Sequence, residues 1–165
     1  MTKQYTNALT SELLTQLNTP SHTPEQLAAL PEEAQKIILK QQEYDSLHPV
    51  NTIYRFAVEG SLTRDGGVIQ TGTTKMTIID ENGKERRIAQ TQDVVRYPDG
   101  STAIITSGAG KESYSSEGKS FALVGSQLSN GDEIISTPQH IALLAIREGY
   151  QLPDDFLVQG QNNGN

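Results

Sequence analysis

The chain has 165 residues, with 13 lysines and arginines against 20 aspartates and glutamates, which gives a net charge of −7. A nucleic-acid-binding surface needs clustered positive charge, so this balance disfavours that class. The sequence contains no cysteine, which excludes disulfides, thiolate metal ligands and a cysteine nucleophile. No apolar run reaches the length of a membrane span, and no stretch resembles a signal peptide. We therefore expect a soluble chain made in a reducing compartment.

Residues 1–52 are predicted to form an N-terminal helical extension. Leucines at helical spacing over 10–17 follow a threonine or serine suited to the N-cap. Thr23-Pro24-Glu25-Gln26 has the pattern of a capping box with proline at the first helical position. A third helix is expected from about Glu32 to His48, where Pro49 ends it. This helix carries a narrow apolar stripe of Ala34, Ile37, Ile38, Gln41 and Tyr44. The stripe must pack on the rest of the chain, on a second copy or on a partner.

Residues 53–137 are predicted to be a β domain built from short strands and glycine turns. Eleven of the 14 glycines lie between Gly60 and Gly131. Residues 51–59 and 75–79 are rich in β-favouring side chains, and Asn82-Gly83 is a strong hairpin signal. Charges of both signs are scattered through the region, which is typical of solvated strand faces.

Residues 138–158 are predicted to be a C-terminal helical segment. The stretch Pro138 to Glu148 is rich in leucine and alanine, and Gly149 is suited to cap it. Residues 154–158 are expected to add one short element. Residues 159–165 are a polar tail that we predict to be disordered or a flexible linker.

The β domain contains an internal repeat. Asp65-Gly66, Asp99-Gly100 and Asn130-Gly131 lie roughly 30 residues apart, and each is followed by β-branched and small hydroxyl residues. Two other glycine turns, at Asn82-Gly83-Lys84 and Glu117-Gly118-Lys119, lie between the copies. The order predicts three hairpins closed around a pseudo-threefold axis, because isolated hairpins cannot bury a core. The alternative is that glycine-turn hairpins resemble one another by chance.

At these residues the sequence resembles the PAAR-repeat family, small cone-shaped proteins that sharpen the spike of bacterial type VI secretion systems and related contractile tails. The resemblance covers about residues 56–137, roughly half the chain. It rests on a succession of motifs in the family's order, namely Leu62 to Thr73, Asn82 to Lys84, Tyr97 to Gly100, Glu117 to Gly125 and Leu128 to Ser136. It implies a mainly β (α+β) fold, a tapered pseudo-threefold cone of β-hairpins with N-terminal helices and a short C-terminal helix.

The resemblance also implies a function. Such a protein caps a trimeric VgrG-like spike protein. Its helical extensions would lie along the cone, dock an effector or chaperone, or hold the tip to the spike. It would be held in the bacterial cytoplasm during assembly and then exported on the spike, without nucleic acid or a membrane anchor. The alternative is a cargo or effector of the same machinery, with the repeat as delivery module and the helices as active part. A third interpretation is an unrelated small β domain.

We expect no enzyme, because no motif assembles catalytic chemistry. The sequence lacks a nucleophile elbow, a His-Glu-x-x-His pair and a phosphate loop. Residues 107–112 only faintly resemble a phosphate loop, and a strand end is the preferred interpretation. No catalytic or cofactor-binding residue is therefore predicted.

The resemblance fails at the metal site. Proteins of the family usually bind zinc near the tip through histidines and a cysteine, and the matching positions hold Asp65, Tyr97 and Asn130. We therefore predict no zinc. The histidines lie outside the motifs and are expected to be structural or exposed, namely His22, His48 and His140.

An acidic metal site at the tip is the alternative. Asp65, Asp99 and Asp132 could hold calcium or magnesium if their turns converge. Tight turns select aspartate and asparagine before glycine on backbone grounds alone. We therefore favour metal-free hairpins.

Overall fold

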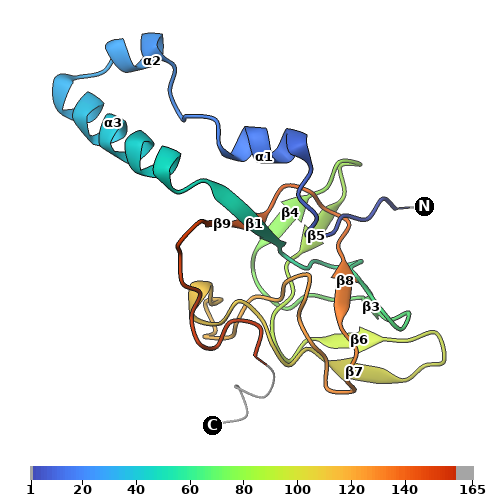
Figure 1. Ribbon diagram of the computed structural model, residues 1–165. Coiled ribbons are helices and arrows are strands. Elements are labelled where there is room, and N and C mark those ends of the chain that lie inside the picture. The colour runs from blue at the N-terminus through green and yellow to red at the C-terminus, as the bar shows by residue number, and fades with distance from the viewer. Residues whose placement is uncertain (1, 159–165) are drawn as a thin grey trace. The chain divides into compact units, whose positions relative to one another are not determined.

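A computed structural model of the chain describes residues 2–158, so the predicted tail at 159–165 lies outside the described residues. The protein is of mixed α+β class, with N-terminal helices followed by several small antiparallel sheets (Figure 1). It divides into two compact units. The helical unit contains residues 8–53 and 145–150, and the β unit contains the described residues 2–7, 54–144 and 151–158.

The predicted N-terminal helices are confirmed. They are α1 (Ser11–Leu17), α2 (Pro24–Ala28) and α3 (Glu32–Leu47). The Thr10 hydroxyl accepts from the Leu13 N–H, and Thr23 forms a reciprocal capping box with Gln26. No helix among the described residues is long and apolar enough to cross a membrane.

The apolar stripe predicted on α3 is only half right. Ala34 and Ile38 are half-buried, but Ile37 is 70% exposed and Tyr44 is 53% exposed. The inward face is rotated toward Gln42, whose side-chain amide donates to the His22 carbonyl oxygen. This contact fixes which side of α3 faces the segment before α2, and apolar periodicity alone does not reveal it.

The predicted C-terminal helix is wrong. Within 138–148 the chain forms strand β9 (Leu143–Arg147), which pairs with β1 (Val50–Arg55). The Gln139 side chain turns the chain before β9, since its amide oxygen accepts from the N–H groups of Ile141 and Ala142. Strand pairing thus overrides the helix propensity of a leucine- and alanine-rich segment.

The β unit is built from short antiparallel strands. Its main sheet has the order β7-β6-β3-β2-β8, with β2 (Leu62–Thr63), β3 (Val68–Ile69), β6 (Val94–Arg96), β7 (Thr102–Ile104) and β8 (Ile134–Ser136). A separate hairpin joins β4 (Thr77–Ile79) to β5 (Glu85–Arg87), as Asn82-Gly83 predicts, and a short 3₁₀ helix lies at Gly110–Glu112.

The main sheet closes on itself. Ile105 pairs with Leu128 next to β7, and Gln127 pairs with Glu133 next to β8. Residues 127–128 therefore join the two outer strands, so strand pairing follows a closed ring of three hairpins. A closed ring removes the free strand edges that would otherwise template aggregation.

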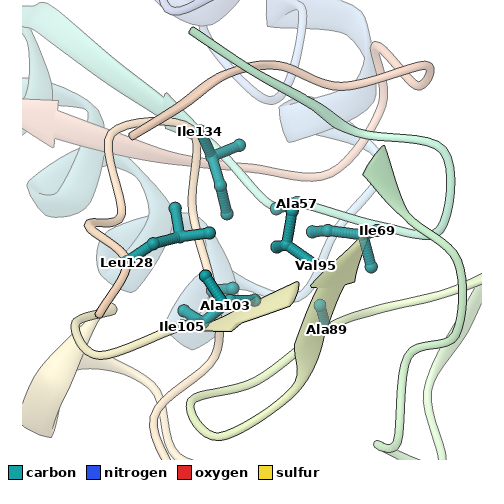
Figure 2. Packing of buried hydrophobic residues seen from close by; sticks show 9 residues of the cluster. Ala57, Ile69, Ala89, Val95, Ala103, Ile105, Leu128 and Ile134 are labelled. Atoms are coloured by element: carbon teal, nitrogen blue, oxygen red, sulfur yellow. The ribbon is translucent and has the colours of Figure 1, made fainter. Parts of the chain in front are cut away.

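A small core fills the interior of this ring. Figure 2 shows the labelled side chains of this core gathered between the hairpins. Nine buried residues contribute to the core, namely Ala57, Ile69, Ala89, Val95, Ala103, Ile105, Ala122, Leu128 and Ile134. Each fully buried isoleucine or leucine contributes roughly 1.5–3 kcal/mol through burial. Four of the nine are alanines, which let the backbones approach closely and explain how a chain with 35% hydrophobic residues makes a closed core.

Candidate functional site

Three four-residue corners repeat the same hydrogen bonds. They are Val58–Ser61, Gln90–Asp93 and Leu123–Ser126. In each corner the N–H of the last residue donates to the carbonyl of the first, and the last side chain accepts from the N–H of the first. The N–H of the third residue then donates to the carbonyl of an isoleucine about ten residues further along the chain, namely Ile69, Ile105 and Ile134.

The glycine turns also share one geometry. In the turns 63–67, 97–101 and 128–132 the first N–H donates to the fifth carbonyl, and the glycine N–H donates to the first carbonyl. Turns 80–84 and 115–119 have the same two bonds. The three repeated turns and the two glycine turns between them are therefore of one type, and its glycine has a positive φ in every copy.

Three alanines link the copies in a closed cycle of backbone hydrogen bonds. The N–H of Ala57 donates to the carbonyl of Ala122, Ala122 donates to Ala89, and Ala89 donates to Ala57, each at 2.9 Å. Each alanine directly precedes one of the corners. Each bond thus joins two copies, and the cycle closes after three.

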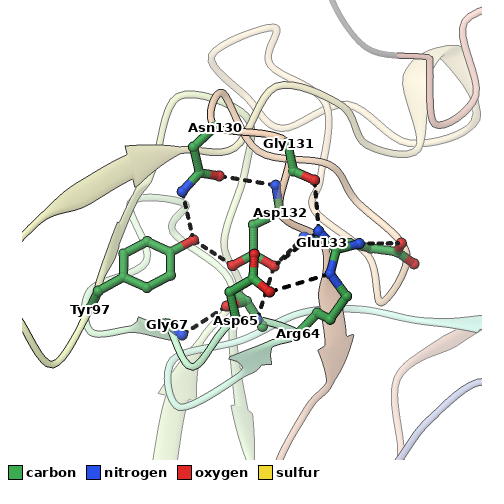
Figure 3. A network of polar contacts seen from close by, with 9 residues as sticks. Arg64, Asp65, Gly67, Tyr97, Asn130, Gly131, Asp132 and Glu133 are labelled. Carbon is green, nitrogen blue, oxygen red and sulfur yellow. Dashed lines mark hydrogen bonds and ion pairs between the residues drawn. The ribbon is translucent and has the colours of Figure 1, made fainter.

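The turns 63–67, 97–101 and 128–132 meet at one place, which we call the three-turn junction (Figure 3). Its central group is the Asp132 carboxylate, whose side chain is completely buried. One oxygen accepts from the backbone N–H groups of Asp65, at 3.1 Å, and Glu133, at 2.7 Å. The other accepts from the Tyr97 hydroxyl at 2.5 Å. Asp132 thus contacts both of the other turns.

Further polar contacts surround this carboxylate. The Arg64 guanidinium donates to the Gly131 carbonyl at 2.9 Å and lies 3.8 Å from an Asp132 oxygen. The Asn130 amide donates to the Tyr97 hydroxyl oxygen at 3.0 Å. The Thr63 hydroxyl accepts from the Gly67 N–H and also hydrogen-bonds Asp132. The junction is therefore a hydrogen-bonded network with contributions from all three turns.

The network sets the ionisation of its members. Burial raises the pKa of the Asp132 carboxyl, but hydrogen bonds from Thr63, Tyr97 and two backbone N–H groups outweigh it and hold this pKa below the ordinary aspartate value. Burial and the bond to Asp132 raise the pKa of the Tyr97 phenol. The two shifts agree, because the phenol must keep its proton to donate it to a carboxylate.

The structure brings together some of the residues singled out from the sequence and separates others. Asp65, Tyr97 and Asn130, the positions matching the family's metal ligands, all lie at the junction. Asp99 does not reach it, because its carboxylate bonds to Ser101 within its own turn. Among residues 2–158 no three histidine, aspartate or glutamate side chains are grouped to hold a metal ion. The acidic three-carboxylate site is therefore not formed.

The three histidines lie elsewhere and contact neighbouring side chains. His48 stacks on Tyr44 with ring centroids 4.2 Å apart, His22 hydrogen-bonds Ser21, and His140 lies 5.2 Å from the Tyr5 ring centroid. The residue that sequence reasoning missed is Asp132 as a buried hub. In the sequence, Asp132 is distinguished only by its position directly after Asn130-Gly131. That position predicts a turn, but it does not predict that the Asp132 side chain is buried.

A second repeated feature lies directly before each of the three alanines. The residues before Ala89, Ala122 and Ala57 are Ile88, Phe121 and Phe56. Each of them donates its backbone N–H to a carbonyl of another segment of the chain. The acceptors are the carbonyls of Met76, Ser113 and Ala142. At or next to each acceptor is an exposed apolar side chain, which we call the exit residues: Met76, Tyr114 and Ile141.

A hollow of about 600 Å³ lies within the β unit, between residues 108–120 and the segment before Val158. Its wall includes the backbone of three glycines together with Lys119 and Asp155. The Asp155 carboxylate is engaged by the Tyr114 hydroxyl, at 3.1 Å, and by the Lys111 N–H, at 2.9 Å. These contacts make Asp155 a fastening point for the 151–158 segment.

Comparison with known proteins finds no match to a protein-family model, to a curated protein or to a solved structure.

Proposed function

We propose that the chain is a non-enzymatic, PAAR-like tip protein that caps a trimeric spike protein of a bacterial type VI secretion or contractile-tail apparatus. The observation that carries the proposal is the closed cycle of hydrogen bonds among Ala57, Ala89 and Ala122. Three equivalent corners and three equivalent turns around this cycle support a pseudo-threefold, tapered arrangement of hairpins. The meeting of three turns at one junction supports a narrow end.

Symmetry matching is the physical basis of the cap. A single chain with three similar segments offers three similar contacts to a partner with a threefold axis. The exit residues supply such a set, since Met76, Tyr114 and Ile141 are 55%, 50% and 61% exposed. Short strand pairs next to them can add backbone hydrogen bonds to strands of the spike. In this proposal the exit residues face the spike and the junction faces away from it.

The helical unit is the proposed site for an effector or chaperone. Ile37, Tyr44 and Leu47 of α3 are 70%, 53% and 69% exposed. Their spacing of seven and three residues places them on one side of the helix, where they form an exposed apolar surface. The same observation favours the alternative function, a cargo of the same machinery whose helices are the active part. Expression of the full chain in bacteria separates the two, because a toxic effector arrests growth and a tip protein does not.

The test uses the trimeric spike protein encoded in the same genome. We expect the purified full chain to bind it at one copy per three spike chains, measured by light scattering of the complex. Met76→Glu, Tyr114→Glu and Ile141→Glu should each weaken binding at least tenfold, because each places a charge in an apolar contact. Val94→Glu is the matched control, since Val94 is 45% exposed and is not an exit residue.

Two results would contradict the proposal. One is a complex with equal numbers of the two chains. The other is equal binding by the exit-residue variants and the Val94→Glu control. A chain that binds no spike protein at micromolar concentration would leave the unrelated β domain as the remaining interpretation.

A further inference from the structure

The three-turn junction brings together backbone segments that are far apart in the sequence. Polar contacts join these segments, while the Tyr97 ring packs against the hydrophobic core. Turn 63–67 and turn 128–132 meet through the Asp65 N–H and Asp132. Turn 97–101 meets turn 128–132 through Tyr97, which contacts Asp132 and Asn130. The Asp132 carboxylate lies in the middle of these contacts, and the Tyr97 hydroxyl beside it also hydrogen-bonds Thr63 of turn 63–67.

The acceptor capacity of this carboxylate is filled by the protein itself. An ionised carboxylate has about four acceptor positions on its two oxygens. Asp132 accepts from the N–H groups of Asp65 and Glu133 and from the hydroxyl groups of Tyr97 and Thr63. Its negative charge is compensated in part by the Arg64 guanidinium at 3.8 Å. This buried carboxylate is strongly held by the N–H groups of Asp65 and Glu133 and the Tyr97 hydroxyl, because charge-assisted hydrogen bonds are about twice as strong as neutral ones.

We propose that Asp132 is a carboxylate clasp that locks the three turns together, so that the end of the β unit is fixed by the chain's own donors and no bound cation is needed there. The clasp goes beyond the proposed function, since it holds whether or not the chain caps a spike. It joins three separate hairpin turns into one end of the β unit.

The clasp has a defined dependence on pH. The titratable groups that face Asp132 are Arg64 and Asp65 from turn 63–67, the neutral phenol of Tyr97 from turn 97–101, and Glu133 next to its own turn. Because the pKa of Asp132 is lower in the folded protein than in an unfolded chain, its stabilisation is complete above the ordinary aspartate pKa and is lost as pH falls further. The junction should therefore stay closed in mild acid.

The test compares Asp132→Asn with Asp99→Asn. Both replace the aspartate of a glycine turn, but the Asp99 carboxylate bonds only within its own turn. We expect Asp132→Asn to lower the Tm by about 5–10 °C at pH 7 and Asp99→Asn to lower it by much less. The difference in Tm between the wild-type protein and Asp132→Asn should persist down to about pH 5 and become smaller below about pH 4. Addition of EDTA should change neither Tm.

Measurements on the wild-type chain keep the proposal testable if Asp132→Asn does not fold. The backbone amides of Asp65 and Glu133 should exchange slowly with solvent, and exchange of the Gly66 amide gives a local comparison within the turn. Fast exchange at Asp65, equal Tm values for the two asparagine variants, or a Tm that falls on addition of EDTA would each overturn the clasp.

Discussion

At the residue scale, the three corners place one backbone position under a shared constraint. The third corner residue has φ of +94° in Gly60, +79° in Gln92 and +109° in Gly125. Side chains other than glycine are strained at positive φ by about 1–2 kcal/mol. The repeat thus has glycine where the backbone requires it in two copies and retains a strained glutamine in the third.

Gln92→Gly should stabilise the protein. The Gln92 side chain is exposed, so little packing is lost, and relief of the positive-φ strain exceeds the entropy cost of glycine. We expect the free energy of unfolding to rise by about 0.5–1 kcal/mol, measured by urea denaturation.

Gly125→Ala is the matched control. A Cβ there would meet only Leu157, at 3.4 Å, so the change isolates the backbone effect and should cost about 1–2 kcal/mol. Stabilisation by Gly125→Ala, or destabilisation by Gln92→Gly, would show that the corners are not equivalent in solution.

At the element scale, the sequence predicts the helix ends and the turns, because interactions between neighbouring residues determine them. Thr10, Thr23 and Pro49 bound the helices because caps and proline act on adjacent residues. The glycine turns likewise mark every hairpin, since positive φ is a property of one residue. These elements could be predicted from the sequence. The junction could be predicted only in part, because Asp65 and Asp132 meet there and Asp99, singled out with them, does not.

The elements that could not be predicted depend on distant partners. Strand β9 forms because β1, almost a hundred residues earlier, offers an edge to pair with. The burial of Asp132 depends on donors from Tyr97 and Asp65, and nothing in the local sequence distinguishes it from the exposed Asp99. Periodicity and turn chemistry contain no information about such partners.

Gln139 is the residue that starts β9, and its loss should be costly. This fully buried side chain accepts from the N–H groups of Ile141 and Ala142 and donates to the carbonyls of Phe56 and Ala142. Gln139→Ala leaves buried backbone groups unpaired, so we expect a loss of about 3 kcal/mol in the free energy of unfolding. Gln127→Ala, at an exposed position, should change it by less than about 0.5 kcal/mol. Equal losses in urea denaturation would show that Gln139 does not hold the turn.

At the scale of the whole molecule, hydrogen bonds between distant segments replace a large apolar core. The alanine cycle, the closed ring of hairpins and the junction each join segments from different copies. Long-range backbone pairing of this kind forms late and cooperatively in folding. We therefore infer that the β unit unfolds as one body, because removal of one hairpin opens the ring and breaks the cycle.

The stability of this body should have a flat maximum between two limits of pH. Hydrogen bonds from Ser101 lower the pKa of Asp99, those from Arg86 and the Lys84 N–H lower the pKa of Asp80, and the network at the junction lowers the pKa of Asp132. Stabilisation from these groups is complete above the ordinary aspartate pKa of about 3.9 and is lost as pH falls below it.

Three tyrosines set the alkaline limit of stability. Hydrogen bonds to carboxylates raise the pKa of Tyr5 and Tyr114, and burial with the bond to Asp132 raises that of Tyr97. A group whose pKa is raised on folding stabilises the protein fully below its unfolded value, about 10, and this contribution is lost as pH rises through the folded pKa. Melting curves should therefore give a Tm that is nearly constant from about pH 5 to 9 and falls outside that range. Tyr97→Phe should remove part of the alkaline fall and leave most of the acid fall in place. A Tm that declines between pH 7 and 5 would mean that groups other than these aspartates control the acid limit, since the stabilisation from Asp80, Asp99 and Asp132 is complete above the ordinary aspartate pKa of about 3.9.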